Sequence, residues 1–250
     1  MKTIRYRIVV LCLCFFGNAF ALPDDFHKYS RMVSFTFDDA YKSVATHAYP
    51  LFRKHGIHAT VYLATATMSN PELFPGYFSW DDAKEVDVHG WEIGAHTHMH
   101  VNLAKSPEEA AAQEISASMQ LFRERGFRPT SFAAPYGAMH EKSMRLIKQN
   151  YASQRDAWGG DGVNPLPVQD PYRIVSLPLK ATMTMADIRA VLDRLEKDGG
   201  WLVLQFHDVG SVNTGPWSTT LLPEIVAEVR RRKLPVATVS EVLKHHSSTH

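Results

Sequence analysis

Short apolar segments alternate with amphipathic segments along most of the chain. The apolar segments are rich in β-branched and aromatic residues, which is typical of buried strands. The clearest is MVSFTFDD (32–39), which ends in two carboxylates and predicts a strand with charged residues at its tip. Further strands, some including the turn that follows, are predicted at residues 58–64, 91–96, 130–137, 151–158, 172–179, 201–208 and 235–243.

The amphipathic segments predict helices. Residues 106–126 give the clearest pattern, because Ser106 is a suitable N-cap, Pro107 suits the first helical position and Glu109 completes a capping box. Gly126 marks the end of this helix. Further helices are predicted at residues 43–55, 79–88, 140–150, 183–200 and 221–233.

This alternation of strands and helices predicts a parallel sheet with crossover helices. No linker, internal repeat or charge block divides the chain, so residues 22–250 are interpreted as one domain of the α/β class. The residues that could take part in catalysis or metal binding nearly all follow predicted strands, which is where α/β barrels place their active sites. They are Asp38, Asp39, His96, Tyr136, Asp156, His207 and Asp208.

The first 21 residues have the pattern of a secretory signal peptide. A basic start precedes an apolar run at 8–16 and the sequence Ala19-Phe20-Ala21, which predicts cleavage after Ala21. The alternative is an uncleaved anchor, but the run is shorter than the ~20 residues that cross a bilayer. We therefore expect no transmembrane segment and a secreted or periplasmic protein.

Cysteine content and charge exclude several classes of site. Cys12 and Cys14 both lie within the predicted signal peptide, so the mature chain would have neither disulfides nor thiolate ligands. The chain has 27 Lys and Arg against 26 Asp and Glu, so its composition gives no indication of a nucleic-acid partner.

Three closely spaced histidines, His96, His98 and His100, suggest a metal site. On a strand all three would share a face, whereas on a helical turn only His96 and His100 would converge. The spacing alone does not decide between these possibilities. Asp38 and Asp39, adjacent after a strand, can point in opposite directions, so that one binds a cation while the other remains free as a base.

Five motifs together resemble, in order and spacing, those of NodB-type polysaccharide deacetylases, carbohydrate esterase family 4. They are TFDD (36–39), HTHMH (96–100), APYG (134–137), DAW (156–158) and LQFHD (204–208). The resemblance extends from about residue 32 to 243 and implies a distorted (β/α)7-type barrel of parallel strands. The forms FAAPYG and DPYRI (170–174) look most like the poly-N-acetylglucosamine deacetylase branch.

The resemblance implies a metal-dependent hydrolase that removes N-acetyl groups from a polysaccharide containing N-acetylglucosamine, such as an exopolysaccharide, a chitin-like polymer or peptidoglycan. Zinc is the first expectation for the metal, with cobalt, nickel or manganese as alternatives. Two other functions stay open. One is an O-acetyl ester hydrolase acting on xylan-like glycans, and the other is a noncatalytic glycan-binding barrel.

The resemblance also implies roles for individual residues. Asp39, His96 and His100 correspond to the metal ligands, which leaves His98 at an unspecified motif position on the rim of the site. The other roles are Asp38 as base, His207 as general acid, Asp156 as its carboxylate partner, the Tyr136 N–H in the oxyanion hole, and Trp158 and Leu204 as walls of the acetyl pocket.

One position departs from the family pattern. The third motif usually carries an arginine that orients the base, and Ala133 stands there in this chain. Arg155 is the preferred substitute, although it should face away from Asp156 on a regular strand, and Arg173 is the second candidate. The alternative is that Arg155 is an ordinary solvated arginine.

Overall fold

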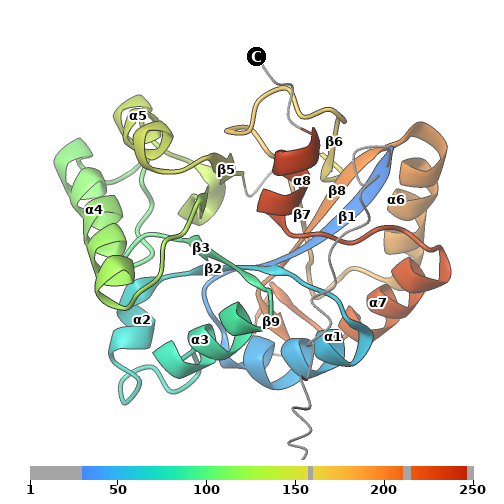
Figure 1. Ribbon diagram of the computed structural model, residues 1–250, viewed down its shortest axis with the longest axis horizontal. Helices are drawn as coiled ribbons and strands as arrows, with labels where there is room; N and C mark the ends of the chain where they lie inside the picture. Colours follow the sequence, from blue (N-terminus) through green and yellow to red (C-terminus); the bar gives the residue numbers. More distant parts are fainter. Residues whose placement is uncertain (1–29, 157–159, 211–214, 247–250) are drawn as a thin grey trace, which may run out of the picture.

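The computed structural model describes residues 30–156, 160–210 and 215–246. A curled sheet forms its centre, with strand order β5-β4-β3-β2-β1-β8-β6 and with β7 paired to β8 (Figure 1). All pairs in this sheet are parallel except β6 with β8. The strands are β1 Arg31–Phe37, β2 Thr60–Leu63, β3 Glu92–Ala95, β4 Ser131–Ala133, β5 Ser153–Arg155, β6 Val163–Asn164, β7 Leu177–Pro178 and β8 Gly200–Phe206.

The segment leading into β7 connects the edge strand β5 with β8. The amide of Asp156, just after β5, donates to the Ile174 carbonyl at 2.7 Å, and an isolated parallel bridge joins Arg155 to Ile174. β7 then pairs with β8. The expected (β/α)7-type barrel is therefore confirmed in a distorted form, in which the predicted strand 172–179 is reduced to Leu177–Pro178 and this bridge.

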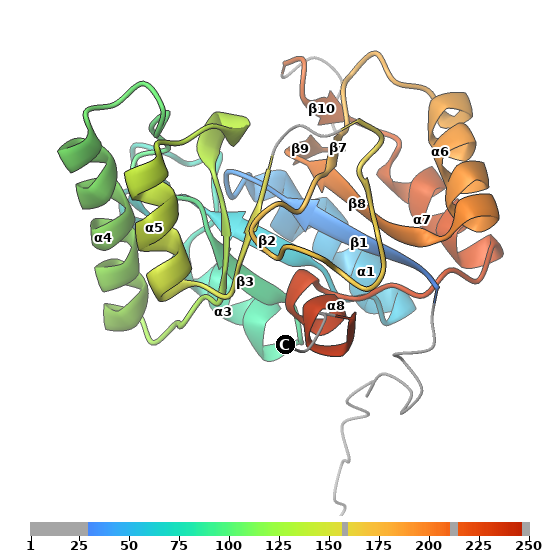
Figure 2. The same cartoon turned by 90° about the horizontal axis from the view of Figure 1, so that it is seen from above.

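Helices cover the outside of the sheet, with α4 and α5 beside β3 to β5 and with α6 and α7 beside β8 (Figures 1 and 2). α8 lies at the amino ends of the strands, where the Val239 amide donates to Thr60 Oγ1 at 3.0 Å. The helices are η2 Val44–Ala48, α1 Tyr49–His55, α2 Thr65–Ser69, α3 Trp80–Val88, α4 Glu108–Glu124, η3 Pro135–Gly137, α5 Glu141–Asn150, α6 Met185–Asp198, α7 Leu222–Arg231 and α8 Val239–His246. A separate pair, β9 Asp208–Val209 with β10 Ser218–Thr219, follows β8.

Alternation along β1 separates apolar from polar side chains. Val33, Phe35 and Phe37 belong to the main hydrophobic core, whereas Ser34 and Thr36, also fully buried, donate hydrogen bonds to backbone carbonyls. Because successive strand residues face opposite ways, Asp38 continues the polar row past the end of β1. Ser34, Thr36 and Asp38, the polar residues at alternate positions of this segment, therefore face the inside of the barrel.

Two local predictions differ from the structure, one at the start of α4 and one before α8. Ser106 Oγ donates to the Asn102 carbonyl and Glu109 pairs with Lys142, so the expected capping box is not formed. The strand predicted at the start of 235–243 is reduced to an isolated parallel bridge between Val236 and Val33, and a hydrogen-bonded box between Thr238 and Glu241 then starts α8.

Candidate active site and metal centre

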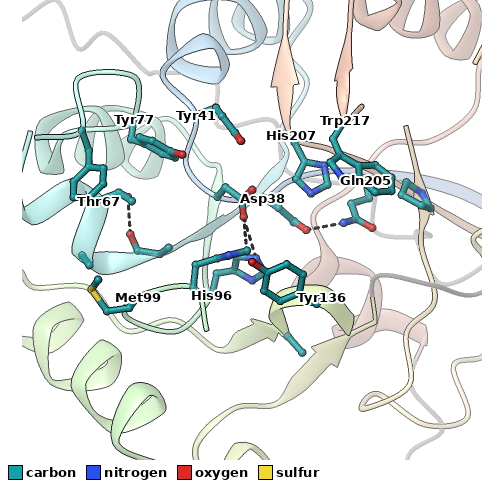
Figure 3. A pocket seen from close by; sticks show the side chains of 17 residues that line it. Asp38, Tyr41, Thr67, Tyr77, His96, Met99, Tyr136, Gln205, His207 and Trp217 are labelled. Atoms are coloured by element: carbon teal, nitrogen blue, oxygen red, sulfur yellow. Dashed lines mark hydrogen bonds and ion pairs between the residues drawn. The ribbon is translucent and has the colours of Figure 1, made fainter. Parts of the chain in front are cut away.

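A pocket of about 470 Å³ lies at the carboxyl ends of the strands (Figure 3). Its volume falls in the range typical of small-molecule sites. Its walls include Asp38, Asp39, His96, His100, Tyr136, Gln205 and His207, together with the aromatic residues Tyr41, Phe74, Tyr77 and Trp217. The loops after β1, β3, β4 and β8 thus contribute side chains to one cavity.

Asp39, His96 and His100 form a group of potential metal ligands. Asp39 Oδ1 lies 3.2 Å from His96 Nε2 and 2.9 Å from His100 Nε2, and one ligand atom from each residue lies within 4.8 Å of the others. Two imidazoles and one carboxylate suit zinc and its neighbours in the first transition row. Such a set leaves coordination positions for water and substrate.

The hydrogen bonding around these ligands fits a cation. His96 Nδ1 lies 2.7 Å from the Ala133 carbonyl, and because a carbonyl only accepts, this contact places the proton on Nδ1 and leaves the Nε2 lone pair toward Asp39. Asp39 Oδ1 is buried and accepts no well-aligned hydrogen bond, despite the two nearby Nε2 atoms.

His98 lies outside this group. Its Nδ1 is 2.9 Å from the Thr65 hydroxyl, and its side chain is not among those lining the pocket. The chain between His96 and His100 is neither a strand nor a helical turn, so neither simple spacing rule applies. In the structure His96 and His100 lie together at Asp39, whereas the His98 side chain contacts Thr65, the first residue of α2.

Left-handed backbone conformations concentrate around the site. Of the six non-glycine residues with positive φ in the described part of the chain, five lie in its loops. Such residues persist only where the surrounding structure holds them, and they often mark functional sites. They are Asp39 (φ 68°), Ala40 (64°), Thr97 (65°), His100 (57°) and Tyr136 (60°).

Asp38 is held by two buried donors. Arg155 Nη2 lies 2.6 Å from Oδ1 and 2.5 Å from Oδ2 of Asp38, and the Arg155 side chain is only 1% exposed. Gln205 Nε2 donates to Asp38 Oδ2 at 2.8 Å (Figure 3). Arg155 thus lies where the missing motif arginine would be needed, and it is not a solvated surface residue.

Gln205 and Ser176 extend this network, and neither was predicted as a site residue. Arg155 Nη1 donates to Ser176 Oγ at 2.9 Å, and Ser176 Oγ lies 2.9 Å from Gln205 Oε1. The sequence did contain a basis for predicting Gln205. It stands two positions before His207, and residues two apart on a strand point to the same side of the sheet. Ser176 carried no comparable signal.

His207 lies opposite the metal ligands, with its ring centroid 5.6 Å from that of Trp217. Burial is the main cause that lowers the pKa of His207. The negative charges of Asp38 and Asp39 raise this pKa but do not cancel the effect of burial. Its Nδ1 is buried and has no hydrogen-bond partner within the described ranges.

Asp156, the expected partner of His207, is directed elsewhere. Its Oδ1 accepts a hydrogen bond from Gln154 Nε2 at 2.9 Å, and no described hydrogen bond or ion pair joins it to His207. Arg155 points into the barrel, so the next residue, Asp156, faces away on the same strand end. Burial raises the pKa of Asp156.

The remaining predicted site residues fall in different places. Leu204 is fully buried in the hydrophobic core and does not line the pocket, because the opposite face of β8 carries Gln205. Tyr136 lies at the mouth, 56% exposed, with its ring 5.0 Å from that of His100. The Arg173 side chain is 83% exposed beside Asp170, and Trp158 lies outside the described residues.

Comparison with known proteins identifies a family. Residues 27–153, about half of the chain, match the family model for polysaccharide deacetylase. The chain is 27% identical over 118 residues to the peptidoglycan-N-acetylglucosamine deacetylase PgdA of Listeria monocytogenes, covering 46% of this chain and 23% of that protein. It is 26% identical over 130 residues to a poly-beta-1,6-N-acetyl-D-glucosamine N-deacetylase of Staphylococcus aureus, covering 48% and 45%.

A solved structure of the Bc1960 peptidoglycan N-acetylglucosamine deacetylase has the same fold, with a TM-score of 0.59 and 19% identity. That match covers 89% of this chain and 91% of the other. The chain spans less than half the length of the two relatives above. The described residues contain no helix long and apolar enough to cross a membrane.

Proposed function

Because the chain belongs to the polysaccharide deacetylase family, we propose that it is a metal-dependent hydrolase that removes N-acetyl groups from a glycan containing N-acetylglucosamine. One observation carries this proposal. A group of three potential metal ligands, a carboxylate outside that group and a histidine on the opposite side all line one pocket. These are the components that hydrolysis of an acetamide requires.

A divalent cation held by Asp39, His96 and His100 would make water more acidic and polarise the acetyl carbonyl. Asp38 then accepts the proton of the attacking water as its oxygen bonds to the carbonyl carbon. As the C–N bond breaks, His207 donates a proton to the departing amine, which leaves acetate and a glucosamine unit. The Tyr136 N–H is assigned to the developing oxyanion.

Arg155 and Gln205 orient the base in this mechanism. Both donate to Asp38, so its lone pairs are directed by two side chains from different strands. The charge-assisted contacts from the guanidinium fix the orientation of the carboxylate toward the attacking water. This arrangement favours catalysis over the noncatalytic alternative. The guanidinium that the family motif would place at position 133 is supplied here by Arg155 on β5.

The His207 ring has no assigned carboxylate partner in this proposal. Asp156 is therefore not given the orienting role, and Leu204 is not given a role in the acetyl pocket. Trp217, beside His207, is the candidate wall for the acetyl methyl group. On the opposite wall, Tyr41 and Tyr77 stack with centroids 5.1 Å apart and direct their hydroxyls toward the cavity (Figure 3).

The substrate preference is proposed from the two relatives above, which are N-deacetylases of peptidoglycan and of poly-beta-1,6-N-acetyl-D-glucosamine. Acetate release from β-1,6- and β-1,4-linked N-acetylglucosamine oligomers and from acetylated xylan tests it. We expect release from at least one N-acetyl glycan to exceed release from xylan. Faster release from xylan would favour the O-acetyl ester hydrolase, and no release from any glycan would favour the noncatalytic barrel.

The Arg155→Ala enzyme should lose turnover by about 10²-fold with metal content unchanged, because the base is no longer held in line. Arg155→Lys should restore only part of the rate, since a point charge cannot reproduce the guanidinium contacts. Acetate release, metal content and the unfolding midpoint should be measured together, because removing one partner of a buried ion pair also destabilises the fold. A folded Arg155→Ala enzyme as fast as the parent would exclude this role.

We also propose that the protein acts outside the cytoplasm, secreted or in the periplasm. This rests on the signal-peptide pattern of residues 1–21, which lie outside the described residues. Amino-terminal sequencing of the exported protein tests it, with Leu22 as the expected first residue.

A further inference from the structure

The loop that carries His96 and His100 has an unfavourable backbone conformation. Thr97 and His100 have φ values of 65° and 57°. A β-branched residue such as threonine is a true outlier in the left-handed region. Contacts from outside the loop must therefore hold it in the geometry that brings both rings to Asp39.

A carboxylate on α4 supplies one of these contacts. Glu114 Oε2 accepts hydrogen bonds from the backbone N–H groups of His98, at 3.2 Å, and Met99, at 2.7 Å. Successive N–H groups directed at one oxygen form a small anion-binding concavity. Hydrogen bonds to an ionised carboxylate are also stronger than those between neutral groups.

The other side of the loop is held from α2 by neutral groups. The amides of Thr65 and Ala66 donate to the carbonyls of Thr97 and His98, at 3.3 and 3.0 Å. The Thr65 hydroxyl lies 2.9 Å from His98 Nδ1. The loop is thus fixed between α2 and α4 (Figure 1), and in this set of contacts only Glu114 contributes a charge.

We propose that Glu114 is a positioning residue that sets the metal affinity of the site by fixing the loop of His96 and His100. This inference rests on the metal site of the proposed function. Met99, whose N–H is held, directly precedes His100, so losing Glu114 would free His100 to leave its left-handed conformation. His96 is also anchored by the Ala133 carbonyl, so the effect should fall mainly on His100.

Metal binding to the full chain tests this role without requiring activity. Zinc dissociation constants are measured by competition with a chromophoric chelator, and the absorption spectrum of the cobalt-loaded protein reports the ligand geometry. Glu114→Ala should bind zinc 10- to 100-fold more weakly, as is usual for groups that orient metal ligands, and its cobalt spectrum should change. Glu114→Gln should lose only several-fold, because its amide oxygen still accepts hydrogen bonds.

Glu124→Ala is the matched control. Glu124 is exposed on the same helix and contacts Gln120 rather than the loop, so this variant should match the parent. Parental zinc affinity and cobalt spectrum in a folded Glu114→Ala protein would overturn the proposal, even if its unfolding midpoint fell. If Glu114→Ala does not fold, an unchanged affinity and spectrum in Glu114→Gln would overturn it. A parent chain that binds no metal would overturn the proposed function as well.

Discussion

Replacing His96 or His100 by alanine is expected to remove the bound metal and reduce acetate release to background. In the proposed function each imidazole supplies one of three ligands, Asp39 being the third, and two ligands do not retain a divalent ion against buffer and solvent. Elemental analysis of the purified variants gives the metal content, and acetate release gives the turnover.

His98→Ala is the matched control, because it removes a neighbouring imidazole that binds Thr65 and does not line the pocket. It should keep most of the metal and most of the turnover. Equal loss in all three variants would show that the ligands are misassigned.

Asp38→Asn should keep the metal and lose turnover by about 10²- to 10⁴-fold, the range expected when a general base is removed. Asparagine retains an oxygen that can accept from Arg155, so the buried network is only partly disturbed. The side chain can no longer take a proton from water. Metal content and acetate release are measured on the same preparation.

His207→Ala should give a loss of similar size, since the departing amine would receive no proton from the protein. Near-parental turnover in either variant would remove that residue from the mechanism. Loss of metal from Asp38→Asn would instead mean that Asp38 belongs to the ligand group.

Much of the fold could be predicted from the pattern of polar and apolar residues along the chain. In β1 the polar letters lead directly to Asp38, because strand side chains alternate between the two faces. The failures were local. The run 235–243 has a strand-like composition, yet Thr238 and Glu241 form a helix-starting box that the sequence analysis overlooked.

The same alternation explains which site residues were misplaced. Arg155 ends a regular strand, β5, so alternation directs Asp156 to the opposite side when Arg155 points into the barrel. Gln205 faces inward for the same reason that Leu204 faces the core. Alternation was considered for Arg155 and Asp156 but not for Leu204 and Gln205.

The left-handed conformations of the loops were beyond sequence analysis. Aspartate and histidine enter this region more often than most residues but only as a small minority, and Thr97 is β-branched, so residue type does not predict these positive φ values. Their conformations depend on contacts from distant parts of the chain, such as Glu114 on α4. The convergence of the three potential metal ligands is consequently a property of the tertiary structure.

Removal and restoration of metal tests the central claim most directly. Acetate release from the preferred N-acetylglucosamine oligomer is followed in the parent protein after exhaustive chelation and during titration with zinc, cobalt, nickel or manganese. We predict background release without metal and full recovery at one equivalent of a divalent ion per chain. Undiminished release from the fully chelated protein would contradict a metal-dependent deacetylase at Asp39, His96 and His100.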